Sequence, residues 1–88
     1  VECMTKAGMA LGLEEELAAR LARATVEGSG ELLFRDPSHS ASVLRQNVTS
    51  PGGTTAAALK VLMAPDGLEP LLVKALAAAR QRAAELSG

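Results

Sequence analysis

Apolar residues recur every three or four positions along most of the chain, which is the repeat of an α-helix. The clearest stripe of this kind comes in the first half, at Leu13, Leu17, Leu21, Ala24, Gly28 and Leu32. A second stripe lies near the end, at Leu68, Leu71, Leu72, Ala75, Leu76, Ala79, Ala83 and Leu86. The strict alternation of a half-buried β-strand is absent. The pattern therefore predicts an all-α protein, a bundle of about five helices.

Turn and capping residues predict where these helices begin and end. We expect helices over residues 1–11, 14–32, 37–47 and 54–64, and a last one from the turn at 65–67 to residue 86. Gly12 is expected to cap the first helix, and Asp36 followed by Pro37 is expected to start the third. Asp66 and Glu69 have the spacing of a capping box at the start of the last helix.

Two glycines, Gly28 and Gly30, fall inside the second predicted helix. Each weakens a helix by about 1 kcal/mol relative to alanine. Two explanations stay open: the helix frays locally, or Gly28 allows another helix to approach closely.

The chain has 88 residues and a mass of 9.0 kDa, which allows one domain at most. Leu and Ala supply most of its apolar residues, and Phe34 is its one aromatic residue. The two stripes are broader than four or five short helices can hide within one subunit, so we expect a homodimer joined through them. Because the sequence begins with Val1 and not with Met, we also expect a piece of a longer protein.

Charge and cysteine content exclude several classes of protein. The formal net charge of −1, without a basic stripe, argues against a nucleic-acid partner. No apolar run is long enough to span a membrane, and no signal peptide is visible. A single cysteine, Cys3, excludes an internal disulfide and a cysteine-based zinc site, and a cytoplasmic setting fits it.

The stretch from Val48 to Thr55 is the strongest candidate for chemistry. Pro51 fixes its own backbone angle, and Gly52 and Gly53 can adopt positive φ without steric cost. A helix begins immediately afterwards, so unpaired backbone N–H groups gather at the positive end of its dipole. Such a loop suits a carboxylate or phosphate group, although a plain turn with a threonine N-cap explains the same residues. It is neither a Walker A loop, because the lysine is missing, nor a dinucleotide-binding loop, because no strand precedes it.

Other reactive residues carry weaker signals. His39 has no second histidine to form a metal site with and is expected to be a solvated surface residue. Cys3 lies among helical residues and is expected to be a small core residue.

Three segments resemble the C-terminal domain of pyrroline-5-carboxylate reductases, the last enzymes of proline biosynthesis. They are Lys6–Leu13, Asp36–Val48 and the loop motif Thr49–Thr55, which continues into Ala58, Leu59 and Leu62. The similarity covers nearly all of the chain. It departs at Met63, where the family usually has a polar or acidic residue, and at His39, which falls slightly later than the family's His-Pro.

The resemblance implies an architecture. Residues 1–88 would form the C-terminal helical dimerisation and substrate-binding domain, through which two subunits interlock, often within a larger ring of dimers. The Rossmann half that binds NADP or NAD would be absent. The chain alone is therefore expected to have no reductase activity.

The resemblance also implies a reaction, the reduction of 1-pyrroline-5-carboxylate to L-proline by hydride from NAD(P)H. It assigns substrate binding to Ser50, Gly52, Gly53, Thr54 and Thr55. Ser50 and the backbone N–H groups of Thr54 and Thr55 would hold the carboxylate. The hydroxyl of Thr55 would face the ring nitrogen as the catalytic group, and Asn47 and Val48 would lie near the nicotinamide ribose.

Two other functions are weighed against this one. The chain could be a non-enzymatic helical dimerisation module in which the glycine-rich loop is only a turn. A DNA-binding helical module is disfavoured because the charge is balanced and no helix is basic.

Overall fold

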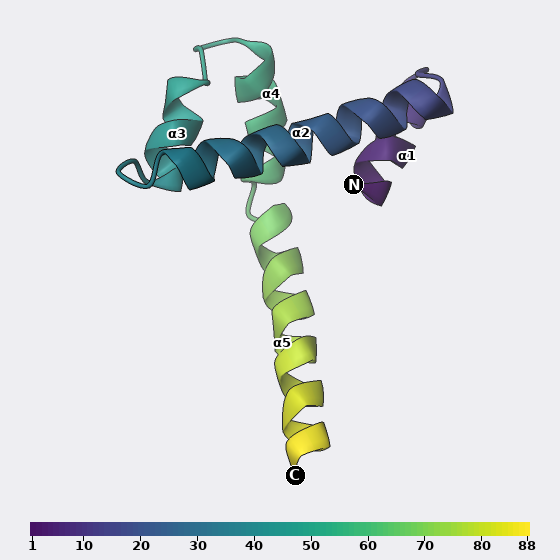
Figure 1. The fold of residues 1–88 in the computed structure, drawn as a ribbon, viewed down its shortest axis with the longest axis vertical. Helices are drawn as coiled ribbons and strands as arrows, with labels where there is room; N and C mark the ends of the chain where they lie inside the picture. Colours follow the sequence, from purple (N-terminus) through teal and green to yellow (C-terminus); the bar gives the residue numbers. More distant parts are fainter. The chain divides into compact units, whose positions relative to one another are not determined.

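The computed structural model describes all residues from Val1 to Gly88, and it contains five α-helices and no strand (Figure 1). The helices are α1 (Glu2–Ala10), α2 (Glu15–Arg35), α3 (Ala41–Asn47), α4 (Thr54–Leu62) and α5 (Leu68–Ser87). The predicted all-α class with five helices is confirmed. The chain divides into two compact units, Val1–Ala41 and Ser42–Gly88, which are described in turn.

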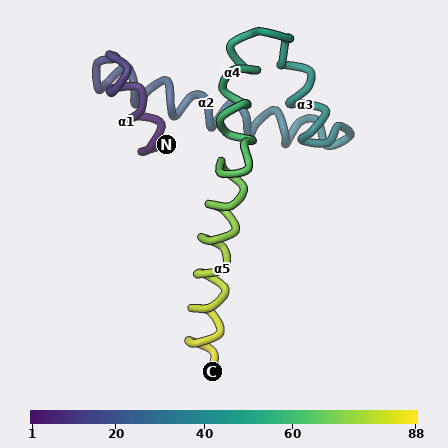
Figure 2. The backbone as a smooth tube through the Cα atoms, turned by 180° about the vertical axis from the view of Figure 1, so that it is seen from behind, coloured from purple at the N-terminus to yellow at the C-terminus, as the bar shows by residue number.

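In the first unit, α1 and α2 form a helical hairpin whose turn is set by Gly12 (Figures 1 and 2). The amide of Gly12 donates to the carbonyl of Met9, and the amide of Leu13 donates to the carbonyl of Gly8, both at 3.0 Å. Gly12 has a φ of 105°, in the left-handed region that favours glycine. Together these features make a Schellman motif, in which Leu11 is the C-cap and Gly12 the residue after it.

The two helices of the hairpin meet through small residues. Ala18 and Ala22 of α2 are the buried core, at 3% and 4% exposure. A Cβ placed on Gly8 of α1 would lie only 3.2 Å from the Cβ of Ala18. The absence of a side chain at Gly8 therefore allows the close approach of α1 to α2.

The second helix continues unbroken through Gly28 and Gly30 as far as Arg35, three residues beyond the predicted end. Local fraying at the glycines is thus the wrong explanation. A Cβ on Gly28 would have no neighbour within 4 Å, so the space beside it is open. Close approach by a helix of another subunit stays a prediction.

The prediction that the third helix begins at Pro37 is wrong, because α3 begins at Ala41. The carboxylate of Asp36 does not cap a helix there. It accepts hydrogen bonds of 2.9 Å from the Ser38 hydroxyl and from Nδ1 of His39. These side-chain bonds stabilise a local turn that competes with the first turn of a helix.

The capping box predicted before the last helix is also wrong. The N-cap of α5 is Gly67, and no side chain bonds to the cap. The amide of Gly67 donates to the carbonyl of Ala64 at 2.8 Å, and a Cβ on Gly67 would lie 2.7 Å from the carbonyl oxygen of Val61. Only glycine fits this tight turn, and α5 begins directly after it, one residue beyond the position that Asp66 would cap.

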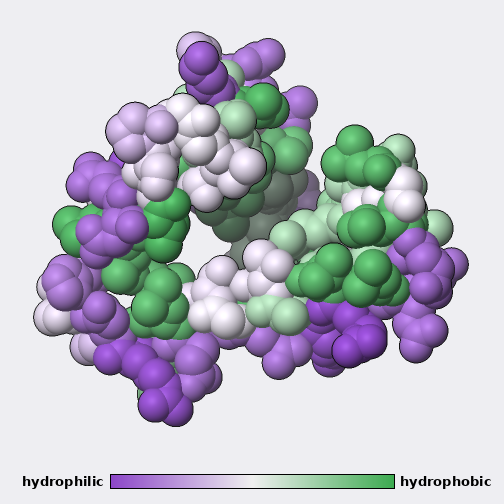
Figure 3. All heavy atoms as spheres, turned by 90° about the horizontal axis from the view of Figure 1, so that it is seen from above, coloured by the Kyte–Doolittle hydropathy of each residue, from purple (hydrophilic) through white to green (hydrophobic).

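Within the second unit, α5 extends away from α4 as a single helix (Figures 1 and 2). All of its residues are exposed, including Leu71 at 62% and Leu76 at 69%. Figure 3 shows hydrophobic residues at the surface of the chain. The predicted apolar face of α5 is therefore present but has no partner within its unit. No helix combines the length and the apolar character needed to cross a membrane.

Candidate functional site: the loop between α3 and α4

The loop that joins α3 to α4 is built around a β-turn at Ser50–Gly53. The amide of Gly53 donates to the carbonyl of Ser50 at 2.9 Å, and Gly52 has a φ of 73°. Proline at the second position and a positive φ at the third are features of a type II turn. The expected conformational role of Gly52 is confirmed.

Gly53 suits the loop for a different reason. Its φ is −84°, which any residue can adopt. A Cβ at this position would, however, lie 3.2 Å from the carbonyl oxygen of Ser50 and 3.4 Å from its Cβ. Gly53 therefore provides space for the turn to fold back onto Ser50.

The first turn of α4 presents backbone donors without acceptors. Gly53 is the N-cap, so no side chain is available to cap the helix. The amide of Gly53 is used by the turn, whereas those of Thr54, Thr55 and Ala56 have no acceptor within the chain. The interpretation as a turn with a threonine N-cap is wrong in this respect, because Thr54 is already helical. Three free N–H groups at the positive end of a helix favour an anion.

The hydroxyl groups of the loop divide into two kinds. Those of Ser50, Thr54 and Thr55 make no hydrogen bond within the chain. The hydroxyl of Thr49 donates to the carbonyl of Arg45 at 2.6 Å. Sequence reasoning gave Thr49 no role, although its position four residues after Arg45, at the end of a helix, allows this bond.

The remaining predicted site residues lie on the α3 side of the loop. Asn47 is the last residue of α3, and Val48 follows it with its amide 3.3 Å from the carbonyl of Arg45. Both side chains are exposed. All the predicted site residues therefore lie in one unit. They are found at the end of α3, in the Ser50–Gly53 turn and at the start of α4.

The charge around the loop also favours an anion. Residues 37–65 contain Arg45, Lys60 and His39 but no Asp or Glu, although the whole chain has a net charge of −1. No carboxylate of this segment would therefore repel a negatively charged ligand at the loop.

The other reactive side chains form no second site. Cys3 is exposed, so the expectation of a core cysteine is wrong. His39 is exposed as expected, and its hydrogen bond, together with that of Ser38, lowers the pKa of Asp36. No three His, Cys, Asp or Glu side chains gather to hold a metal ion.

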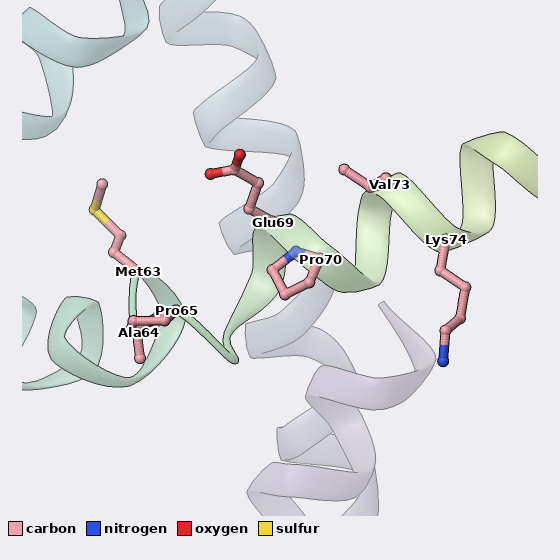
Figure 4. Close-up of a pocket in the computed structure, with 7 residues that line it drawn as sticks. All are labelled: Met63, Ala64, Pro65, Glu69, Pro70, Val73 and Lys74. Atoms are coloured by element: carbon pink, nitrogen blue, oxygen red, sulfur yellow. The ribbon is translucent and has the colours of Figure 1, made fainter.

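A surface hollow of about 530 Å³ lies at the joint between α4 and α5 (Figure 4). It is lined by Met63, Ala64, Pro65, Glu69, Pro70, Val73 and Lys74. Its two charged side chains, Glu69 and Lys74, point in different directions (Figure 4). The hollow therefore lacks the paired polar groups of a catalytic site.

Fold and loop together define an all-α domain with exposed apolar helix faces and a loop that is followed by three unpaired backbone amides of α4. Residues 1–86 match the protein family described as "Pyrroline-5-carboxylate reductase dimerisation". The chain belongs to this family of dimerisation domains, which confirms the family resemblance.

Curated relatives agree with the family assignment. The chain is 45% identical over 87 residues to the pyrroline-5-carboxylate reductase of Pseudomonas aeruginosa, covering 99% of this chain and 31% of the relative. It is 39% identical over 87 residues to that of Arabidopsis thaliana, with the same two coverages. It is 38% identical over 102 residues to that of Mycobacterium leprae, covering 98% of this chain and 34% of the relative. The chain thus spans about a third of the length of these relatives. No solved structure matches it.

Proposed function

We propose that residues 1–88 are the dimerisation and substrate-binding domain of a reductase that converts 1-pyrroline-5-carboxylate to L-proline in proline biosynthesis. The reductases named above support the reaction, and the family description supports the pairing of subunits. The single observation that carries the substrate-binding role is the set of free amides of Thr54, Thr55 and Ala56 beside the Ser50–Gly53 turn.

In this proposal the substrate carboxylate binds at the start of α4. The amides of Thr54 and Thr55 and the free hydroxyl of Ser50 donate hydrogen bonds to it. Gly52 supplies the positive φ of the turn, and Gly53 leaves room for the turn beside Ser50. Because these donors are fixed by the fold, little reorganisation is needed when the anion arrives.

Thr55 is proposed to act on the ring nitrogen of the imine. Its hydroxyl is free within the chain and sits one residue after the first helical position, half-buried. It orients the imine and can relay the proton that the nitrogen gains. A threonine hydroxyl is too weak an acid to act unaided, so positioning supplies most of the rate.

A reduced nicotinamide, NADPH or NADH, supplies the hydride to the imine carbon when bound. This chain has no strand and hence no strand–loop–helix site for the nucleotide's phosphates, so its residues fit only the nicotinamide end. Asn47 and Val48, both exposed at the end of α3, are proposed to lie against the nicotinamide ribose. The rest of the nucleotide would bind to a dinucleotide-binding domain outside these residues.

We propose that the domain pairs with a second copy of itself in the cytoplasm. The homodimer interlocks through the exposed faces of α2 and α5, and dimers can assemble further into a ring. The exposed free thiol of Cys3 is compatible with a reducing, cytoplasmic environment.

The competing function is a dimerisation module without a binding site, which the wholly exposed α5 would favour. Titrating the ¹⁵N-labelled chain with L-proline separates the two functions. We expect amide shifts confined to residues 50–56. Shifts elsewhere only, or none at millimolar proline, would leave the chain as a dimerisation module.

A further inference from the structure

We infer that Thr49 is a positioning residue, whose side chain holds the substrate loop in the orientation that presents the free amides of α4. The inference rests on the proposed function, because it assigns a role within the same loop. Thr49 would touch neither substrate nor cofactor. It would act through the backbone of residues 50–55.

The hydroxyl groups of the loop differ in their hydrogen-bond partners. Ser50, Thr54 and Thr55 keep their hydroxyls free, whereas Thr49 donates its proton to the carbonyl of Arg45 at 2.6 Å. A hydroxyl that is committed to the backbone cannot also donate to a ligand. The four hydroxyls thus have two different functions, and only that of Thr49 is structural.

The bond from Thr49 to Arg45 lies at the end of α3. The amide of Thr49 donates to the carbonyl of Gln46 at 3.1 Å, so backbone and side chain of one residue close the end of α3 together. Thr49 is half-buried, while Val48 and Ser50 on either side are exposed. It is therefore the point at which the loop is attached to α3.

Thr49 lies directly before the residues that present the free amides. The turn begins at Ser50, directly after Thr49, and α4 begins at Thr54, directly after the turn. No residue separates the anchored position from the turn. A rotation of the backbone at Thr49 would move Ser50 and redirect the amides of Thr54 and Thr55.

The test uses Thr49→Val and Thr49→Ser in the complete reductase that carries this domain. Valine keeps the shape but loses the hydroxyl, and serine keeps the hydroxyl. Thr25→Val is the matched control, because Thr25 donates the same kind of bond to the carbonyl of Leu21, at 2.7 Å, in α2. Gly53→Val reports independently on the proposed carboxylate site.

The readouts are KM for 1-pyrroline-5-carboxylate, the inhibition constant of L-proline, and kcat. We expect Thr49→Val to raise KM and the inhibition constant together by about tenfold, since substrate and product share the carboxylate donors, and to change kcat less. Thr49→Ser and Thr25→Val should stay close to the unaltered enzyme. A loss of folded protein would instead lower kcat and leave KM unchanged, and that result would overturn the inference.

Two further outcomes separate this inference from the proposed function. If Gly53→Val raises KM and Thr49→Val does not, the loop binds substrate but Thr49 does not position it. If neither variant changes KM or the inhibition constant, the carboxylate site and the role of Thr49 are both wrong.

Discussion

The carbonyl oxygen of Ser50 accepts a hydrogen bond from the amide of Gly53 at 2.9 Å. This bond closes the turn before α4, so the amide of Gly53 is not available to a ligand. The next three amides, those of Thr54, Thr55 and Ala56, stay free. The turn therefore shapes the site, and the start of the helix supplies the donors.

Replacing Gly53 with valine is expected to raise KM for the imino acid by about tenfold or more. The added Cβ would lie 3.2 Å from the carbonyl oxygen of Ser50, so Ser50 must give way by a few tenths of an ångström, and we expect the amides that follow to shift with the turn. Steady-state kinetics of the complete reductase measure the effect. Gly30→Val is a control for a lost glycine, because a Cβ at Gly30 has no neighbour within 4 Å. An unaltered KM for Gly53→Val would show that the loop is only a connector.

Replacing Thr55 with alanine is expected to lower kcat/KM by about tenfold or more, because one oriented hydrogen bond to the ring nitrogen is lost. The amide of residue 55 is retained, so the carboxylate should still bind and the dimer should stay intact. Thr55→Ser should restore most of the activity. Thr54→Ala, which removes the neighbouring exposed hydroxyl, should have a smaller effect. Equal kinetics for Thr55→Ala and the unaltered enzyme would remove Thr55 from the mechanism.

Periodicity and glycine placement made most of the helices predictable from the sequence. The stripe at Leu13, Leu17 and Leu21 lies on α2, and Gly12 ends the preceding helix with the positive φ expected of it. Gly52 likewise adopts positive φ in the predicted loop. These signals depend on residues close together in sequence, which is why they could be read without coordinates.

The errors arose where two local interactions compete. Asp36 has the identity of an N-cap, but its carboxylate bonds to the side chains of Ser38 and His39 instead. Asp66 has the spacing of a capping box, but Gly67 lies in a tight turn and is itself the N-cap. The helix α5 therefore begins one residue later than a capping box at Asp66 would place it. The role inferred for Thr49 was missed for a related reason. The end of α3 at Asn47 was predicted, but the sequence does not show that the hydroxyl two residues later bonds back to the carbonyl of Arg45.

The pair of Asp36 and His39 predicts a stability that depends on pH. The hydrogen bonds from His39 and then Ser38 lower the pKa of Asp36 in the folded chain below its usual value. A carboxyl group whose pKa is lower in the folded chain than in the unfolded chain stabilises the fold. This stabilisation is complete at pH values above the usual pKa, and it is lost as the pH falls through the pKa of the folded chain. Asp36→Asn should therefore lower Tm at pH 7, and the difference from the unaltered chain should shrink below about pH 4.

Thermal unfolding followed by circular dichroism at pH 7, 5 and 3 measures this difference. Asp66→Asn is the control, because the carboxylate of Asp66 makes no hydrogen bond in the structure. A Tm difference for Asp36→Asn that is the same at all three pH values would contradict the assignment.

The open space beside Gly28 predicts two opposite effects of Gly28→Ala. Within the chain the added methyl meets nothing, so α2 should gain about 1 kcal/mol. If a helix of the partner subunit packs against Gly28, the dimer dissociation constant should rise by about tenfold. Gly30→Ala should stabilise α2 by the same amount, but its methyl group projects from another side of the helix. Sedimentation velocity measures the dimer dissociation constants of the two variants. Equal constants for Gly28→Ala and Gly30→Ala would show that Gly28 lies outside the contact between subunits.

The exposed face of α5 predicts that charge there prevents dimer formation. Leu76 is 69% exposed in the single chain, and burying a leucine against a partner contributes about 1.5–3 kcal/mol. Leu76→Glu loses this contribution and would also place a carboxylate in an apolar contact, so the dissociation constant should rise by about 100-fold or more. Ala77→Glu adds the same charge to the side of α5 that lies opposite the centre of its apolar stripe, and it should leave the dimer intact. Light scattering at low micromolar concentration compares the two variants. A dimer that survives Leu76→Glu would show that the subunits pair through another face, and dissociation by both variants would show that the effect comes from charge and not from the apolar face.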